Sequence, residues 1–202
     1  MYLFFDTETS GLATDGGQLM QLGAILTDAQ FMELATLDTL VQVPAQTQIH
    51  PKALAAHGIT LERCQAEGRP AAQALAQFAE MAARAQISVA FNNKFDLLIM
   101  ANMFKQYELL NPLEAMEHRC PMTELTPIIK LPGKFKGTYK WPKLQEAYTF
   151  IMGHGFDGAH DALSDVKATI ECFKWLERNR RPTQTQVLQD ALKLGANAIA
   201  SL

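Results

Sequence analysis

Three apolar runs open the chain, separated by short polar connections. They cover Tyr2–Phe5, Leu19–Leu26 and Leu34–Val43. Their lengths and their branched and aromatic residues are typical of buried strands. Because the connections are short, the three runs predict an antiparallel meander at the start of the fold.

The spacing of apolar residues then becomes helical. Ala71–Arg84 and Asp96–Tyr107 each place their apolar residues on one helix face, and a short apolar run between them, Ile87–Phe91, predicts a buried strand. After a stretch punctuated by prolines, Asp161–Arg178 predicts a long helix. Strands first and alternating elements afterwards indicate an α/β fold, a mixed sheet flanked by helices.

The length of 202 residues, 48% of them hydrophobic, is sufficient for one domain with one core. We expect this domain to span residues 1–180 and residues 181–202 to form a C-terminal tail with one short helix, Gln184–Leu194. No apolar run reaches the roughly 18 residues of a membrane-spanning helix, and Asp6 interrupts the N-terminus before a signal-peptide core forms. We therefore expect a cytoplasmic protein without membrane contact.

Cysteine usage and net charge narrow the function classes. Cys64, Cys120 and Cys172 are odd in number and lack Cys-x-x-Cys spacing, which argues against a disulfide framework or a zinc site and favours a reducing compartment. A net charge of −3 argues against a protein that coats nucleic acid. It is compatible with a nucleic-acid enzyme whose carboxylates hold divalent cations against phosphates.

Two carboxylates close the first predicted strand. Asp6 and Glu8 are two residues apart, so the alternation of a strand points both side chains to one face. Like charges at this separation raise each other's pKa unless a cation intervenes, and oxygen-only ligands favour magnesium or manganese. Taken alone, the pair is equally compatible with a solvated strand end.

Further acids and a histidine stand at the start of two predicted helices. Asp96 begins the helix that follows the fourth predicted strand. His160 precedes the long helix, Asp161 is a candidate N-cap, and Asp165 lies in the opening turns. Each is individually more typical of a cap or a surface residue, and their combination with Asp6 makes them candidates for chemistry.

In order and separation, these segments resemble the three motifs of the DEDDh (DnaQ-like) exonuclease family. Residues 6–12 resemble the first motif, residues 92–96 the second, and residues 160–165 the third with its His-x-x-x-x-Asp spacing. Residues 57–60 resemble a secondary element, so the likeness covers about residues 1–178. It implies an RNase H-like fold and a metal-dependent 3′-5′ exonuclease that releases nucleoside monophosphates from single-stranded 3′ ends.

The resemblance also implies roles for individual residues. Two Mg²⁺ ions, for which Mn²⁺ can substitute, would be held by Asp6, Glu8, Asp96 and Asp165, and Asp6 would bridge both. His160 would be the general base. The terminal nucleotide would contact Thr9, Gly11, Leu12, Asn92 and Phe95. The chain departs from the family at Phe91, where many members have His, but this position is not a metal ligand in the family pattern.

A basic stretch lies between the second and third motifs. Residues 130–143 contain five lysines and no acid, interleaved with Phe135, Tyr139 and Trp141. Lysines that neutralise phosphates and rings that stack on unpaired bases are typical of single-strand binding. The alternative is a solvated loop whose aromatics pack inward. The candidate substrate contacts here are Lys134, Lys136, Tyr139 and Lys140.

The motifs hold metals and phosphates and do not read the sugar. We favour DNA as the substrate, and a 3′-5′ exoribonuclease that trims RNA ends or short RNA is the alternative. A non-catalytic module that binds nucleic-acid ends for a polymerase partner is a further alternative, disfavoured because all five catalytic positions are filled. A polymerase and a second copy of the chain are both candidate partners, and the biological pathway stays open.

Overall fold

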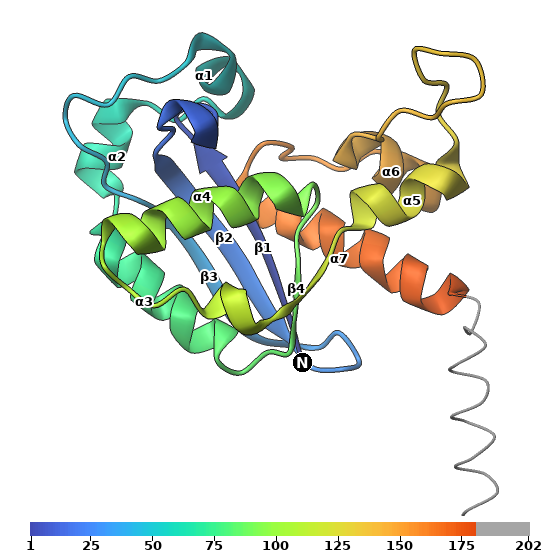
Figure 1. Ribbon diagram of the computed structural model, residues 1–202, viewed down its shortest axis with the longest axis horizontal. Coiled ribbons are helices and arrows are strands. Elements are labelled where there is room, and N and C mark those ends of the chain that lie inside the picture. Colours follow the sequence, from blue (N-terminus) through green and yellow to red (C-terminus); the bar gives the residue numbers. More distant parts are fainter. Residues whose placement is uncertain (181–202) are drawn as a thin grey trace, which may run out of the picture.

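The computed structural model describes residues 1–180, which form a five-stranded sheet with helices on both faces (Figure 1). The strand order is β3-β2-β1-β4-β5. The strands are β1 (Tyr2–Thr9), β2 (Leu19–Thr27), β3 (Glu33–Leu40), β4 (Ile87–Val89) and β5 (Glu117–Arg119). β1, β2 and β3 pair antiparallel, as the meander predicts, whereas β4 and β5 run parallel to β1. The predicted mixed sheet is confirmed.

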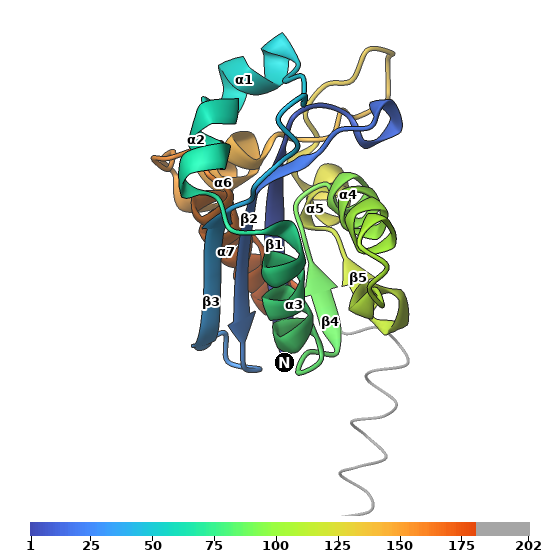
Figure 2. The same cartoon turned by 90° about the vertical axis from the view of Figure 1, so that its left-hand side faces the viewer.

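Helices follow the strands in the order that the sequence indicates, with several additions. The described α-helices are α1 (Pro51–His57), α2 (Leu61–Glu67), α3 (Ala71–Ala82), α4 (Asn93–Gln106), α5 (Pro121–Ile129), α6 (Leu144–Met152) and α7 (Ala162–Asn179). Two short 3-10 helices are η1 (Ala13–Asp15) and η2 (Pro112–Ala115). Figure 2 shows α4 and α7 on opposite sides of the sheet. None of the helices in residues 1–180 is both long enough and apolar enough to cross a membrane.

Alternate side chains of β1 belong to two different core clusters. Phe5 packs with residues of α3 and α4, including Phe78 and Phe104. Phe4 packs with residues of α7, including Val166 and Phe173. Because the alternation continues along the strand, the carboxylates that follow Phe4 at intervals of two residues face α7.

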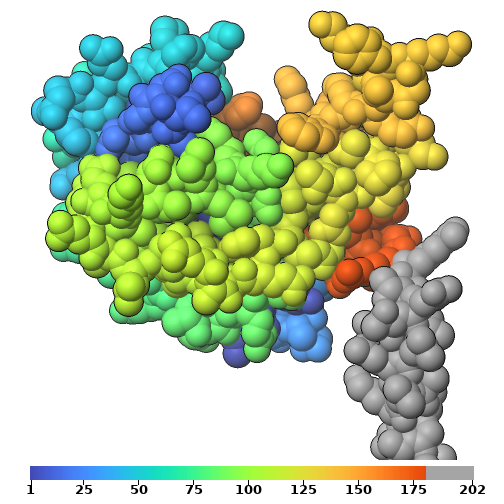
Figure 3. Space-filling view, viewed as in Figure 1, coloured from blue at the N-terminus to red at the C-terminus, as the bar shows by residue number. Residues whose placement is uncertain are grey.

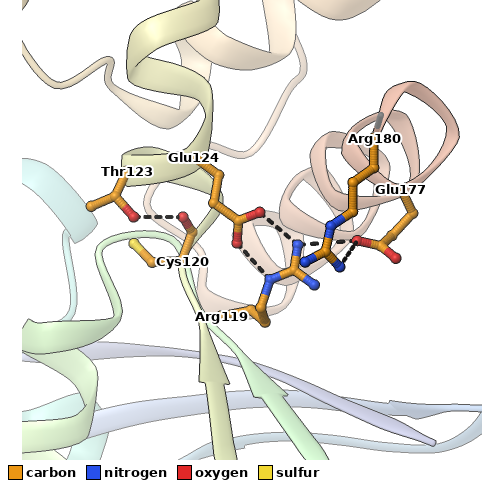
Figure 4. A network of polar contacts seen from close by, with 6 residues as sticks. All are labelled: Arg119, Cys120, Thr123, Glu124, Glu177 and Arg180. Carbon is orange, nitrogen blue, oxygen red and sulfur yellow. Dashed lines mark hydrogen bonds and ion pairs between the residues drawn. The ribbon is translucent and has the colours of Figure 1, made fainter. Parts of the chain in front are cut away.

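The parallel side of the sheet is tied to α5 and α7 by a partly buried arginine (Figure 4). Arg119, whose side chain is 11% exposed, donates from Nε and Nη2 to the two carboxylate oxygens of Glu124 at 2.6 and 2.5 Å. Its Nη2 also donates to Glu177 Oε1 at 3.0 Å. The guanidinium carbon lies 4.7 Å from the centroid of the Phe173 ring. Because these residues come from β5, α5 and α7, the network joins three elements.

Several predicted boundaries are wrong by a few residues. The third strand ends at Leu40 and not at Val43. The next residue, Val41, lies outside the strand and makes an isolated bridge to Arg69. β4 ends at Val89, two residues before the predicted end. α4 begins at Asn93, so Asp96 lies in its first turn and is not the helix start. The predicted tail, with its helix Gln184–Leu194, lies outside the described residues.

Candidate active site

The first two candidate ligands occupy the end of β1 on the face that carries α7. Asp6 pairs with Gly23 of β2, and Glu8 pairs with Gln21. The register shifts between Glu8 and Thr9, which marks a bulge immediately after the two acids. Both side chains are partly buried.

Asp96 reaches the same end of β1 from α4, on the opposite face of the sheet. It is 2% exposed, and its Oδ1 accepts hydrogen bonds from the backbone N and the Oγ1 of Thr7 at 3.1 and 2.7 Å. Thr7 lies between Asp6 and Glu8 and faces away from them, so it joins the second motif to the first. Asn92 occupies the N-cap position of α4 in the left-handed region, at φ 68°, and its side chain makes no capping hydrogen bond.

The third motif is a turn followed by the first residues of α7. The N–H of Asp161 donates to the Gly158 carbonyl at 3.1 Å, and His160 has φ 68° within this turn. Asp161 caps the helix, as predicted, because its Oδ1 accepts from Ser164 N at 3.0 Å. The backbone N of His160 donates to Asp165 Oδ2 at 3.4 Å. The turn therefore holds His160 and Asp165 beside each other.

Three of the candidate residues offer ligand atoms to one point. Glu8, His160 and Asp165 have side-chain ligand atoms that all lie within 4.8 Å of one another. Asp165 Oδ1 is buried and has no hydrogen-bond partner. An orphaned buried carboxylate oxygen is costly unless a cation or water completes it. The donor set therefore fits a divalent cation.

Burial raises the pKa of all four carboxyl groups, and nearby negative charges raise each of them further. Burial, then the neighbouring Asp96, Asp165 and Glu8, raises the pKa of Asp6 well above its usual range. Burial and the same kind of repulsion raise the pKa of Glu8 to about 8. The pKa of Asp96 is raised to about 7 by burial, which the hydrogen bonds from Thr7 oppose, and that of Asp165 to about 6 by burial. The charged cluster therefore needs a positive partner.

A cavity of about 780 Å³ adjoins Glu8, whereas Asp6, Asp96, His160 and Asp165 do not line it. This volume lies within the range of small-molecule sites. Its walls include the end of β1, the turn around η1, the start of α1 and one residue of α4. Of the residues predicted to contact the terminal nucleotide, the cavity is lined by Thr9, Gly11, Leu12 and Phe95. Leu12, which is 59% exposed, presents an apolar side chain at this cavity.

His57 lines the cavity, and its hydrogen bonds hold its ring in a single tautomer. Its Nδ1 accepts from the N–H of Ile59 at 2.9 Å, so Nε2 carries the proton and donates to the Thr9 carbonyl at 3.1 Å. Burial lowers the pKa of His57. The Thr9 hydroxyl donates to the Gly11 carbonyl at 2.8 Å. Residues 57–60 thus stabilise the turn within the first motif.

Residues 130–143 form a projecting loop, which we call the basic hairpin. Pro132 and Tyr139 make an antiparallel bridge, and Gly133 N donates to Thr138 O at 2.9 Å. Phe135, Tyr139 and Trp141 are 69%, 47% and 61% exposed, so the alternative in which these aromatics pack inward is wrong. Figure 3 shows a hollow between the segment near residues 11–17 and the gold part of the chain that holds the hairpin.

Some predicted contacts lie away from the cavity. Lys134, Lys136, Tyr139, Lys140 and Asn92 do not line it. Lys140 Nζ is paired with Glu146 Oε1 at 2.6 Å. Conversely, His50 and Lys52 line the cavity although the sequence did not single them out. Their position depends on a loop contact, since the N–H of His50 donates to Ser10 O at 2.7 Å.

A comparison with models of protein families identifies the family to which this chain belongs. The family model described as exonuclease (RNase T) matches residues 3–173. The chain belongs to this exonuclease family. The predicted DEDDh-type, DnaQ-like family is thus confirmed, and the family depends on divalent metal. No curated protein matches the chain by sequence.

Solved structures of E. coli Exonuclease I share the fold of this exonuclease domain. The complex with a dT13 oligonucleotide has a TM-score of 0.75 at 23% identity, covering 95% of this chain and 43% of that one. The zinc-bound complex with single-stranded DNA has a TM-score of 0.74 at 23% identity, covering 89% and 41%. The chain thus spans less than half the length of these proteins. The predicted RNase H-like fold is confirmed.

Proposed function

We propose that the chain is a magnesium-dependent 3′-5′ exonuclease that releases nucleoside monophosphates from single-stranded DNA. The observation that carries this proposal is the convergence of Glu8, His160 and Asp165, whose ligand atoms lie within 4.8 Å of one another, with Glu8 also lining the cavity. Asp6 and Asp96 belong to the same cluster, because Asp96, Asp165 and Glu8 raise the pKa of Asp6, and Asp96 also raises the pKa of Glu8.

The carboxylates hold the cations in this proposal. Asp6, Glu8, Asp96 and Asp165 provide the oxygen ligands that Mg²⁺ and Mn²⁺ prefer. Two such ions held there would supply an activated water and would neutralise the charge that develops on the scissile phosphate. Thr7 keeps one oxygen of Asp96 occupied, which leaves the other for the cations.

His160 acts as the general base in this proposal. Its side chain is exposed, and its ligand nitrogen lies within 4.8 Å of carboxylate oxygens of Glu8 and Asp165. A neutral imidazole in this place can accept a proton from the attacking water. The turn from Gly158 to Asp161 sets the direction of the ring.

The cavity accounts for exonucleolytic action. It accepts the terminal nucleotide between Leu12 and Phe95, next to Glu8. The backbone turn after β1, held by His57, closes one side. Confinement of the last nucleotide places the phosphate that precedes it at the carboxylates. The enzyme therefore removes one nucleotide per cycle.

DNA is the proposed substrate, and the basic hairpin is proposed to hold the unpaired strand behind the terminal nucleotide. Solved structures of E. coli Exonuclease I contain dT13 and dA16 oligonucleotides, which are single-stranded DNA. The exposed aromatics and lysines of the hairpin match the chemistry of stacking and phosphate neutralisation. The three cysteines are free and buried, which fits the cytoplasm as the compartment.

The proposal is tested by digestion of 5′-labelled DNA and RNA of one sequence. Wild-type protein is incubated with Mg²⁺, with Mn²⁺ and with chelator, beside Asp165→Asn. Asp157→Asn, at an exposed acid outside the cluster, is the matched control. We expect a metal-dependent ladder on DNA with wild type and control, and none with Asp165→Asn. A ladder on RNA alone supports the exoribonuclease, and intact substrate throughout contradicts the enzyme.

A further inference from the structure

The first turn of α7 rests on one glutamine of β2. Gln21, which is 8% exposed, donates from Nε2 to Asp161 Oδ2 at 2.9 Å and to Asp38 Oδ1 at 3.1 Å. Its Oε1 accepts from the N–H of Ala162 at 3.2 Å. A single side chain from the sheet therefore contacts both the cap residue and the first helical residue of α7.

The three hydrogen bonds are compatible with only one orientation of the side-chain amide of Gln21. The two carboxylates of Asp161 and Asp38 require the NH₂ group, and the N–H of Ala162 requires the oxygen. Both Nε2 hydrogens are used. The remaining oxygen of Asp161, Oδ1, accepts from Ser164 N and Oγ at 3.0 and 2.9 Å. The cap is thus fixed from the sheet side and from the helix side.

A glycine in the same strand lets the helix approach this closely. A Cβ at Gly23 would lie 2.6 Å from the carbonyl carbon of Ala162 and 2.7 Å from Leu163 N. The backbones of β2 and α7 are therefore in direct contact. Gly23 pairs with Asp6, as Gln21 pairs with Glu8. The contact between sheet and helix thus lies directly across from the two acids of β1.

The residues that converge on the proposed metal site flank this contact. His160 lies immediately before residues 161–163, the segment that Gln21 and Gly23 contact, and Asp165 lies two residues after it. Their separation from Glu8 therefore depends on where the first turn of α7 rests on β2. We propose that Gln21 is a positioning residue, which sets the placement of His160 and Asp165 against Asp6 and Glu8. This inference rests on the proposed function.

A purely structural role makes a different prediction. If Gln21 only satisfied buried polar groups, its loss would lower stability and leave turnover unchanged at a permissive temperature. If it sets the ligand geometry, turnover and metal affinity fall, because misplacement by about 1 Å costs up to about 100-fold in rate. Residues that orient metal ligands typically contribute about 10–100-fold to affinity or activity.

The experiment compares Gln21→Met with Asp38→Ala in the full chain. Gln21→Met removes all three hydrogen bonds at similar volume, whereas Asp38→Ala removes only the bond to the exposed side chain on β3. We measure kcat and KM on single-stranded DNA, and Mn²⁺ binding to the metal-free protein by calorimetry. We expect Gln21→Met to lower kcat about 10–100-fold, leave KM within about two-fold and weaken Mn²⁺ binding about 10-fold or more. Asp38→Ala should match wild type.

A second pair of variants tests the inference if Gln21→Met fails to fold. Gln21→Glu keeps the acceptor for Ala162 and loses the donor to Asp161, so it should lower kcat and Mn²⁺ affinity. Adding Asp161→Asn returns a donor from the other partner and should recover part of both. A Gln21 variant that folds and keeps wild-type kcat and Mn²⁺ affinity overturns the inference. A wild type without nuclease activity overturns the proposed function instead, and Mn²⁺ binding then still decides the role of Gln21.

Discussion

Thr7 donates two hydrogen bonds to one carboxylate oxygen of Asp96, from its backbone N at 3.1 Å and its Oγ1 at 2.7 Å. The two residues are 89 positions apart and come from β1 and α4. The threonine stands between Asp6 and Glu8 on the opposite face of the strand. Thr7, a residue of the first motif, therefore fixes the position of Asp96 in the second motif.

This contact predicts a role for the Thr7 hydroxyl. Thr7→Val keeps the shape of the side chain and removes the Oγ1 donor, so Asp96 loses its shorter hydrogen bond. We expect kcat to fall about 10-fold or more, as for other residues that orient metal ligands. Thr7→Ser, which retains the hydroxyl, should stay close to wild type. Equal activity of the valine and serine variants would contradict this role.

The crowded carboxylates predict that the metal-free protein loses stability as pH rises. The folded pKa of Glu8 is about 8, that of Asp96 about 7 and that of Asp165 about 6, against ordinary values near 4. Because these values are raised, the unfolded chain holds fewer protons than the folded one between about pH 4 and pH 8. Stability from these groups is present below this window and decreases through it.

Glu8→Gln tests this linkage by removing one charge. In chelator, we expect the melting temperature of the variant to exceed that of wild type increasingly from pH 5 to pH 8. The expected gain at pH 8 is a few degrees, since about 1 kcal/mol corresponds to roughly 2–4 °C at this chain length. Mg²⁺ should stabilise wild type more than the variant. Melting curves whose difference is independent of pH would rule out the repulsion.

The Arg119 network predicts a large effect on stability with little on turnover. Arg119→Ala leaves Glu124 without its partner and Glu177 with only Arg180 at 3.8 Å, at a cost of about 2–3 kcal/mol, below the usual range for fully buried pairs because both acids are partly exposed. Arg63→Ala breaks the exposed pair with Glu67 and should cost less than about 1 kcal/mol. Urea denaturation of both variants measures the difference. Similar costs would contradict the assignment of this network as a structural joint.

The basic hairpin predicts an effect on long strands that depends on salt. Combining Lys134→Ala with Lys136→Ala should raise KM for long single strands and leave kcat on a dinucleotide unchanged. The slope of log KM against log salt should fall by about 1.4, since each phosphate contact to a single strand contributes about 0.7. Arg84→Ala with Lys105→Ala, at exposed positions outside the hairpin and the three motifs, is the control. An unchanged slope would remove the hairpin from the substrate path.

Periodicity was enough to predict the central elements of the fold. The meander, α3, β4, α4 and α7 each have a continuous apolar pattern that one face of the element buries. β5 could not be predicted, because its three residues, Glu117–Arg119, have no such pattern and pair through the backbone with β4. The short helices α1 and α2 were missed for a related reason, since each has seven residues and too few turns to show a helical period.

The candidate site, like the fold, could be predicted only in part from the sequence. The motifs predicted Asp6, Glu8, Asp96, His160 and Asp165 because the acids and the histidine recur at characteristic spacings, and their roles stay predictions. Gln21 carried no signal, since its partner Asp161 is 140 residues away in the sequence. His50 and Lys52 reach the cavity only through the fold of the loop before α1. Contacts distant in sequence are therefore what periodicity and spacing cannot predict.

Release of a 3′ label tests the central claim most directly. Single-stranded DNA that carries its label in the last nucleotide is incubated with Mg²⁺ and wild type, Asp6→Asn or His160→Gln. Wild type should release the label as a mononucleotide in the first turnover, Asp6→Asn should release none, and His160→Gln should be slower by about 100-fold or more. Label that appears first in longer fragments, or equal release by Asp6→Asn, would contradict a 3′-5′ exonuclease site built on these residues.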